Sequence, residues 1–290
     1  PKKRQTLLLS ATFPEDIKKM SRAIQRQPIE VKVDAVLTHD ETVLEQLFFE
    51  IQKHERNTAL LALFEHYQPG NAMVFCNTKK QCAEVAAFLQ EHDIEAAAIH
   101  GDLDQRDRDQ VLLQFTNNSC PVLVASDVAA RGLDIPALAM VVNFELPRDG
   151  DTYVHRIGRT GRAGETGQAF SLVTPSEAPR LRVIEDHLQI NCLCDVLESL
   201  NRNPNYQLQG DMTTLQFDAG RKQKLRPGDI LGALTGDAGL AGDQIGKIKI
   251  LDNSSYVAIA RPVLRQAMNY LAQGKIKGRS IRARHLKLHR

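Results

Sequence analysis

Residues 71 to 102 read NAMVFCNTKKQCAEVAAFLQEHDIEAAAIHGD, and this stretch decides the fold class. It begins with an apolar run typical of a strand, continues with apolar residues at helical spacing, and ends in a second apolar run. Polar residues follow each run, Asn77 and Thr78 after the first and His100 and Gly101 after the second. A strand, a helix and a strand in this order predict two parallel strands of one sheet.

The same alternation continues along the chain. Repeated strand and helix units predict an α/β fold, a doubly wound parallel sheet with helices on both faces. Ligands of such sheets bind beyond the carboxyl ends of the strands, and the polar clusters follow strand ends, so we expect one crevice to collect them. We predict strands at residues 71 to 76, 94 to 99, 121 to 126, 138 to 143 and 168 to 173, and helices at 56 to 67, 79 to 92, 105 to 117 and 176 to 188.

Length and composition limit the class of protein. A chain of 290 residues is long enough for two or three domains. Its apolar runs are far shorter than the roughly 20 residues that cross a bilayer, and no signal peptide opens it, which predicts a cytoplasmic protein without a membrane partner. Five cysteines without a CxxC motif predict buried, reduced thiols. The strand-like run at residues 5 to 11 has no sheet partner nearby in sequence, so we expect an amino-terminal truncation.

Charge divides the chain near residue 210. Residues 210 to 290 carry 15 Lys and Arg, 6 Asp and no Glu, a net charge of +9, whereas residues 1 to 209 carry −7. A solvated lysine surface is the ordinary explanation of a modest charge run. The arginine content and the lack of glutamate favour instead a separate module that binds nucleic acid.

Residues 155 to 162 read HRIGRTGR and concentrate three arginines and a histidine in a short loop. Glycine-spaced arginines are poor packing material, but their planar guanidinium groups bind phosphate oxygens in a bidentate manner. We therefore predict that this loop binds an anion. Taken alone, the segment 100 to 102 is better explained as a turn with a helix cap, and the segment 127 to 134 as a helix with an ion pair and a glycine stop.

Together these segments resemble the motifs of the carboxyl-terminal half of a DEAD-box RNA helicase, in the same order. The matching stretches are SAT at 10 to 12, VFCNTK at 74 to 79, HGDLDQRDR at 100 to 108, ASDVAARGLDI at 125 to 135 and HRIGRTGR. The resemblance covers roughly residues 1 to 190 and implies a RecA-like domain. The basic tail is similar to the RNA-binding appendage of the bacterial DEAD-box protein A (DbpA) group, whose substrate class is large-subunit ribosomal RNA.

The resemblance implies that ATP is bound jointly with a first domain that the sequence lacks. Neither a GxxxxGK[ST] phosphate loop nor an Asp-Glu-Ala-Asp sequence occurs, so Mg²⁺ would be held by the absent domain and this chain would supply no metal ligand. We expect no ATPase activity from this chain alone. The implied catalytic residues are the arginine fingers Arg159 and Arg162 and the closure relay His155; Gly132, Asp134 and both fingers would bind ATP; Ser10 and Thr12 would couple the domains.

RNA contacts are implied in the RecA-like domain as well. They would be made mostly to the RNA backbone, which positions the strand without reading its sequence. Ser126 stands where the family usually has threonine and keeps the hydroxyl group. The implied contacts are Thr78, Gly101, Arg108 and Ser126.

The tail has the βαββαβ order of an RRM, with strands at 213 to 217, 246 to 251, 255 to 260 and 280 to 285 and helices at 227 to 234 and 262 to 273. Taking 246 to 250 and 255 to 260 as the central strands leaves one aromatic residue, Tyr256, which we interpret as packing rather than as a platform for bases. RNA is then expected at basic edges. The candidates are Arg221, Lys222, Lys224, Lys247, Lys249, Lys275, Lys277, Arg279 and Arg282.

The predicted domains are a remnant of the first RecA-like domain with a linker (1 to 36), the second RecA-like domain (37 to 200), a linker (201 to 211) and the RRM-like domain (212 to 290). The resemblance implies an ATP-dependent RNA helicase that binds 23S ribosomal RNA and remodels short duplexes on assembling 50S particles, with no DNA or membrane partner. The alternative is a passive RNA-binding module with the RecA-like domain as a scaffold.

Overall fold

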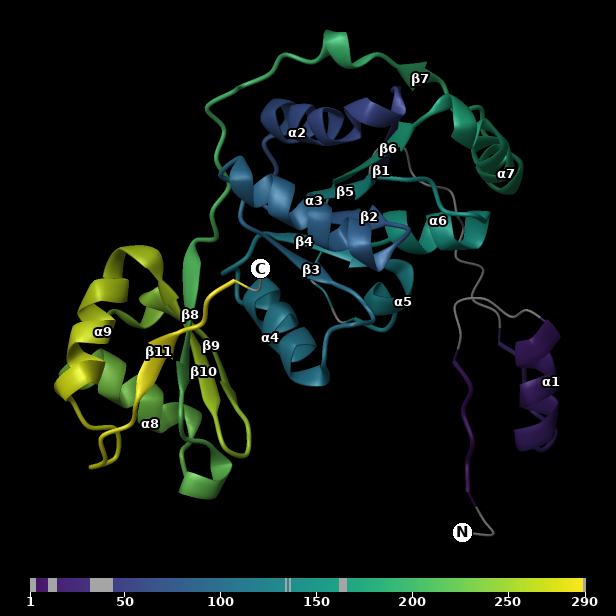
Figure 1. Cartoon of the computed structure of the whole chain (residues 1–290). Coiled ribbons are helices and arrows are strands. Elements are labelled where there is room, and N and C mark those ends of the chain that lie inside the picture. The colour runs from purple at the N-terminus through teal and green to yellow at the C-terminus, as the bar shows by residue number, and fades with distance from the viewer. Residues whose placement is uncertain are drawn as a thin grey trace. The chain divides into compact units, whose positions relative to one another are not determined.

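The computed structural model describes residues 4 to 9, 15 to 31, 44 to 133, 135, 137 to 161 and 166 to 288 (Figure 1). The chain divides into two compact units, Pro1–Thr42 and Val43–Arg290. The first contains the helix α1 (Glu15–Ile24), which begins with acidic residues and carries Arg22 in its last turn, as the helix dipole favours. Residues 4 to 9 form no strand.

A parallel sheet forms the larger part of the second unit. Its strand order, β3-β4-β2-β5-β6-β1-β7, confirms the predicted doubly wound α/β fold. The sequence did not reveal β1 and β7, which extend the sheet beyond β6. The strands are β1 (Leu44–Glu50), β2 (Ala72–Cys76), β3 (Ala96–Ile99), β4 (Val122–Ser126), β5 (Met140–Asn143), β6 (Gly167–Val173) and β7 (Cys194–Asp195).

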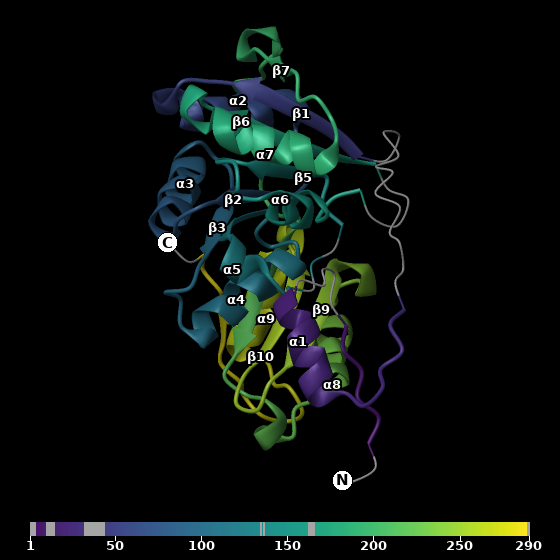
Figure 2. The same cartoon turned by 90° about the vertical axis from the view of Figure 1, so that its right-hand side faces the viewer.

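Helices cover both faces of this sheet, because the apolar side chains of β2 are buried on both faces. Val74 and Cys76 point into a core with α2 and α3, whereas Met73 and Phe75 point into a core with α4 and α5. In Figure 2, α6 and α7 lie on the face of the sheet that is turned toward the viewer. The helices are α2 (Arg56–Tyr67), α3 (Lys79–Glu91), α4 (Gln105–Thr116), α5 (Asp127–Ala130), α6 (Gly150–Ile157) and α7 (Ala178–Leu188).

The tail forms an antiparallel sheet in the order β11-β8-β10-β9, which confirms the RRM-like fold. One detail of the prediction is wrong, because β8 and β10 are the central strands and β9 lies at an edge. Leu215 and Val257 point from the central strands into a core with the two helices. The elements are β8 (Met212–Phe217), α8 (Pro227–Gly232) with a π-helical turn (Ala233–Asp237), β9 (Ile245–Ile250), β10 (Ser255–Ala260), α9 (Leu264–Gln273) and β11 (Ala283–His285).

Most of the cysteine side chains lie inside the protein. The five cysteines form no disulfide; four are buried and Cys194 is half-buried. Burial raises the pKa of the Cys120 thiol to about 12, so this group stays protonated and unreactive at neutral pH. No helix within the described ranges is both long and apolar enough to cross a lipid bilayer.

Candidate nucleotide and RNA interface

The carboxyl ends of three neighbouring strands meet at one edge of the parallel sheet. β2 lies between β4 and β5, and the strand registers place Cys76 beside Ser126 and Phe75 beside Asn143. The polar residues that follow these strands therefore lie together although they are distant in sequence. This is the edge at which doubly wound sheets bind ligands.

Arg156, on the last turn of α6, occupies the centre of this edge. Its side chain is 1% exposed, and it donates to both carboxylate oxygens of Asp127, from Nε at 2.6 Å and from Nη2 at 2.9 Å. It also donates to Asn143 Oδ1 at 3.1 Å, to the Glu145 carbonyl at 2.7 Å and to Asn77 Oδ1 at 2.9 Å. Every nitrogen of the guanidinium group thus has an acceptor, as a buried charge requires.

The interpretation of HRIGRTGR as a loop of arginines without a packed face is wrong for Arg156. Residues 155 to 157 belong to α6, and Tyr153, Arg156 and Ile157 are all buried on its inward side. Their spacing of i, i+3 and i+4 is the mark of one helix face and could have revealed Arg156 in the sequence. Asp127 of the chain itself is therefore one of the anions that offset this cluster of positive charge.

Arg159, a predicted arginine finger, follows one turn later. Its half-buried guanidinium group donates to the carbonyl oxygens of Leu133, at 2.9 Å, and Ala130, at 3.4 Å. Arg159 and the exposed His155 border a hollow of about 20 Å³. That volume holds little more than one water molecule, so the described residues offer a nucleotide a surface rather than an enclosed pocket.

The structure describes only some of the other residues predicted to bind ATP or to couple the domains. Gly132 is exposed in the turn after α5 and has a φ of +69°, a conformation that favours glycine. The half-buried guanidinium group of Arg159 can suit a phosphate group, whereas no group of three or more His, Cys, Asp or Glu within the described ranges could hold a metal ion. The other four predicted residues, Arg162, Asp134, Ser10 and Thr12, lie outside the described residues.

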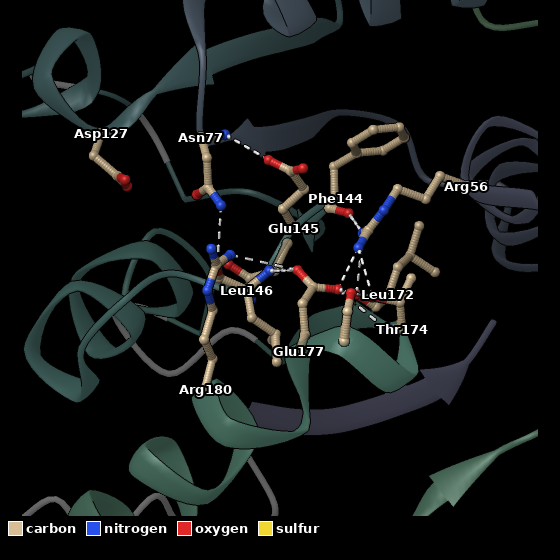
Figure 3. A network of polar contacts seen from close by, with 12 residues as sticks. Arg56, Asn77, Asp127, Phe144, Glu145, Leu146, Leu172, Thr174, Glu177 and Arg180 are labelled. Carbon is tan, nitrogen blue, oxygen red and sulfur yellow. Dashed lines mark hydrogen bonds and ion pairs between the residues drawn. The ribbon is translucent and has the colours of Figure 1, made fainter. Parts of the chain in front are cut away.

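A second buried arginine stabilises the neighbouring part of the domain (Figure 3). Arg56 donates to the Phe144 carbonyl and forms an ion pair with Glu177, which is 5% exposed. Glu177 accepts from the Leu146 backbone N–H at 3.1 Å, and the Leu146 carbonyl accepts from Asn77 Nδ2 at 3.1 Å. The segment after β5 is therefore fixed from both sides, by Arg56 and by the residues around Arg156.

The RNA contacts implied for this domain follow the same strand ends. Thr78 and Gly101 are exposed, and Ser126 is half-buried. The Thr78 hydroxyl caps α3 as an acceptor, which leaves its hydrogen to donate to a phosphate oxygen. Arg108 is half-buried and donates to the Ala129 carbonyl at 2.8 Å, so part of its guanidinium group is already used to hold α4 against α5.

The basic residues predicted to hold RNA in the tail are all exposed. Two of their clusters, 221 to 224 and 275 to 282, are adjacent, because Lys277 Nζ donates to the Lys224 carbonyl at 3.0 Å. Residues of both clusters line a hollow of about 270 Å³. Lys224 and Lys277 also have positive φ values, 60° and 53°, which are uncommon for residues with a Cβ atom. The other two candidates, Lys247 and Lys249, lie on the edge strand β9.

The parallel-sheet domain covers the two central strands on the open face of the antiparallel sheet. Thr214 on β8 and Tyr256 on β10 are 0% and 5% exposed. Thr214 Oγ1 lies 2.8 Å from Ser119 Oγ and accepts from Asn117 Nδ2 at 3.3 Å, while Tyr256 packs against Leu113 of α4. The interpretation of Tyr256 as a packing residue is confirmed, although its partner belongs to the preceding domain.

Polar contacts surround this interdomain packing. Arg261 forms an ion pair with Glu95, and Asn118 Nδ2 donates to Asp211 Oδ2 at 2.9 Å. Gln114, which is 2% exposed, donates to the Leu286 carbonyl at 2.9 Å. These residues were not found by sequence reasoning, because their polar side chains mark an interface only after both domains have folded.

Two family models match this chain. The helicase conserved C-terminal domain matches residues 55 to 164, and the DbpA RNA binding domain matches residues 214 to 285. A solved structure, that of the E. coli DEAD-box protein SrmB bound to regulator of ribonuclease activity A, is 35% identical and has a TM-score of 0.51. Its alignment covers 58% of this chain and 98% of that chain. The chain belongs to the DEAD-box family.

Full-length relatives narrow the resemblance to one group. The chain is 47% identical over 287 residues to the ATP-dependent RNA helicase DbpA of Escherichia coli (strain K12), covering 99% of this chain and 62% of that protein. It is 32% identical over 304 residues to the helicase of the same name from Bacillus subtilis (strain 168), covering 97% and 63%. The expected resemblance to a DbpA-type carboxyl-terminal half is thereby confirmed, and the chain spans somewhat less than two thirds of these relatives.

Proposed function

We propose that this chain forms the second RecA-like domain and the RNA-binding tail of an ATP-dependent RNA helicase. The tail would bind large-subunit (23S) ribosomal RNA, and the complete enzyme would remodel short duplexes during 50S assembly. The observation that carries this proposal is the packing of a tail of net charge +9 against the same domain that presents Arg159 at its strand-end edge. Binding and catalysis would thus use different surfaces of one chain.

The nucleotide surface would complete a site formed with a first domain. Arg159 and Arg162 would stabilise negative charge on the γ-phosphate in the transition state, with Gly132, Asp134 and His155 around them. The hydrogen bonds from Arg159 to the segment after α5 support this role, since fixed donors stabilise a transition state better than mobile ones. Mg²⁺ would be held by the first domain and would bridge phosphate oxygens there.

RNA would be held in two ways. Thr78, Gly101, Arg108 and Ser126 would contact the backbone at the strand ends, without reading its sequence. Recognition of a particular hairpin would come from the basic edges of the tail. The burial of Thr214 and Tyr256 supports this division, because bases cannot stack on a sheet face that is already covered.

The test is RNA-stimulated ATPase activity of the full-length protein with and without residues 205 to 290. We expect the complete enzyme to be stimulated more by a ribosomal hairpin than by an unrelated hairpin at equal salt, and the truncated enzyme to lose this preference. The 290-residue chain alone should show no turnover. Turnover by that chain, or a full-length protein without RNA-stimulated turnover, would contradict the proposal; the latter would favour a passive RNA-binding module.

A further inference from the structure

Arg221 differs from the other basic residues of its turn, because a carboxylate lies beside its guanidinium group. Arg221 Nε is 3.1 Å from Asp252 Oδ1, and both side chains are largely exposed. Lys222 and Lys224 are exposed as well, but neither Nζ atom is paired with a carboxylate in the described part of the chain. A negative charge therefore lies within the surface that is predicted to bind phosphate groups.

The main chain fixes this carboxylate beside Arg221. Asp252 lies in the turn that joins β9 to β10, and the Leu251 backbone N–H closes this turn by donating to the Ser254 carbonyl at 2.8 Å. The backbone N–H of Arg221 donates to the Leu251 carbonyl at 2.8 Å, and that of Lys222 donates to the Asp252 carbonyl at 2.9 Å. Asp252 therefore stays next to Arg221 even when the two side chains separate.

The carboxylate weakens the attraction between Arg221 and a phosphate group. An exposed ion pair is weak, so a phosphate can approach the guanidinium group without a large cost for breaking the pair. The same phosphate then lies close to the negative charge of Asp252, which offsets most of the attraction of Arg221. An RNA that is held through its phosphates alone therefore gains little from Arg221, whereas it gains a full contact from an unpaired lysine.

RNA that is recognised by its bases and RNA that is not differ in their freedom to move on the tail. RNA bound through phosphates alone has no fixed register and can shift until its phosphates meet the accessible cations. RNA bound through its bases has one register, so only the phosphates that this register brings near a cation form a contact. Freeing one more cation would therefore favour unrecognised RNA more than recognised RNA.

We propose that Asp252 is a specificity-determining residue of the tail, which limits the binding of Arg221 to phosphate and so weakens RNA that is held without base recognition. This inference rests on the proposed recognition of a ribosomal hairpin by the tail. A group that disfavours the wrong partner raises specificity as effectively as a new contact with the right one. Lys222 and Lys224 would supply the phosphate contacts that both kinds of RNA share.

The test measures RNA binding by the 290-residue chain over a salt series. One RNA is the large-subunit ribosomal hairpin that the wild-type chain binds most tightly, and the other is the same hairpin with a scrambled loop, which has the same number of phosphates. Asp252→Asn removes the charge next to Arg221 and keeps the shape of the side chain. Asp243→Asn is the matched control, because Asp243 is exposed in the same domain and forms no ion pair within the described ranges.

We expect Asp252→Asn to raise the affinity for the scrambled hairpin by about threefold, the range of one exposed ion pair. The slope of log K against log salt for this hairpin should steepen by about 0.7 to 0.9, as one additional phosphate contact requires. The affinity for the ribosomal hairpin should stay nearly constant, so the ratio of the two affinities should fall by about threefold. Asp243→Asn should leave this ratio unchanged.

A double variant identifies the cation that Asp252 restrains. Arg221→Gln combined with Asp252→Asn should bind the scrambled hairpin no more tightly than Arg221→Gln alone, because no guanidinium group is left to be freed. An equal gain with and without Arg221, an unchanged slope in Asp252→Asn, or equal gains for both hairpins would overturn the inference. A wild-type chain that binds the two hairpins equally at every salt concentration would instead refute the proposed recognition by the tail and, with it, this role.

Discussion

The arginines of the segment 155 to 162 and the basic residues of the tail differ in how they are held. Arg156 is 1% exposed with five hydrogen bonds, and Arg159 is half-buried and bonded to two carbonyl groups. In the tail, Arg221 pairs with Asp252 at 3.1 Å, but the two side chains are 67% and 64% exposed. Such surface pairs are worth little and are easily exchanged for other partners.

This difference corresponds to two ways in which positively charged side chains act on phosphate groups. Stabilising a transition state requires donors that are fixed before the reaction, which buried partners provide. Capturing a large polyanion requires many accessible charges that replace its counterions, and rigid placement adds little there. The comparison therefore predicts large effects on turnover at the predicted finger arginines and small effects on binding at each tail residue.

The largest effect is expected at the fingers. Replacing Arg159 or Arg162 by Lys in the complete enzyme should reduce kcat by about 10³ with little change in nucleotide affinity, because the lost interaction belongs to the transition state. Steady-state kinetics at saturating RNA measures this. Arg180→Lys is a control in the same domain. Arg180 donates a hydrogen bond of 3.1 Å to the Leu146 carbonyl and has no predicted role as a finger. A raised KM with unchanged kcat would refute the role of the fingers.

A smaller effect is expected where the tail packs on α4. Ser119→Arg would force a charged side chain into the contact with Thr214, where Ser119 is 6% exposed. The free energy of unfolding should fall by about 2 to 3 kcal/mol, because a buried unpaired charge is costly. Ser199→Arg places the same change at an exposed position and should alter it by less than about 0.5 kcal/mol. Equal denaturation midpoints for both variants would contradict the interface.

Single basic residues of the tail come next. If Arg221, Lys222 and Lys224 only neutralise phosphates, each alanine variant should weaken cognate and unrelated hairpins alike and reduce the slope of log K against log salt by about 0.7 to 0.9. A residue that reads a base edge should instead cost roughly 1 to 3 kcal/mol on the cognate hairpin alone. Binding titrations over a salt series distinguish the two outcomes. Equal affinity for both hairpins in the wild type at every salt concentration would refute specific recognition by the tail.

The smallest effect is expected at Tyr256. Tyr256→Leu removes the aromatic ring but keeps an apolar side chain against Leu113, so affinity for RNA should change by less than about twofold. A base stacked on this ring would make the loss about 1 to 3 kcal/mol. A loss of that size at unchanged melting temperature would show that the covered sheet face opens to RNA.

The elements predicted from the sequence are those whose apolar pattern is strong. The strand at 71 to 76 and the helix at 56 to 67 were predicted almost to the residue, since β2 is buried at every residue and α2 buries one apolar face against the sheet. By contrast, β1 mixes Phe48 and Phe49 with acidic residues, and α6 has only eight residues with glycine and arginine among them. Their burial depends on neighbours distant in sequence, which a local pattern does not contain.

The candidate site shows the same limit. The motifs located the strand ends and the finger Arg159, because residue type alone indicates a phosphate-binding role. They gave no indication that Arg156 is an internal connector or that Thr214 is buried against Ser119. These roles arise from partners that only the tertiary structure brings together, Asp127 and Asn77 in one case and Ser119 in the other.

An RNA titration of ATPase activity in the full-length enzyme tests most directly whether the finger arginines act on turnover and the basic tail residues act on RNA binding. We predict that Arg159→Lys lowers kcat by about 10³ and leaves the RNA concentration for half-maximal activity unchanged. A triple alanine variant of Lys222, Lys224 and Lys277 should raise that concentration and leave kcat within about twofold, since each lost phosphate contact weakens binding alone. The opposite assignment, with the tail variant lowering kcat at saturating RNA or Arg159→Lys weakening RNA binding alone, would contradict these predictions.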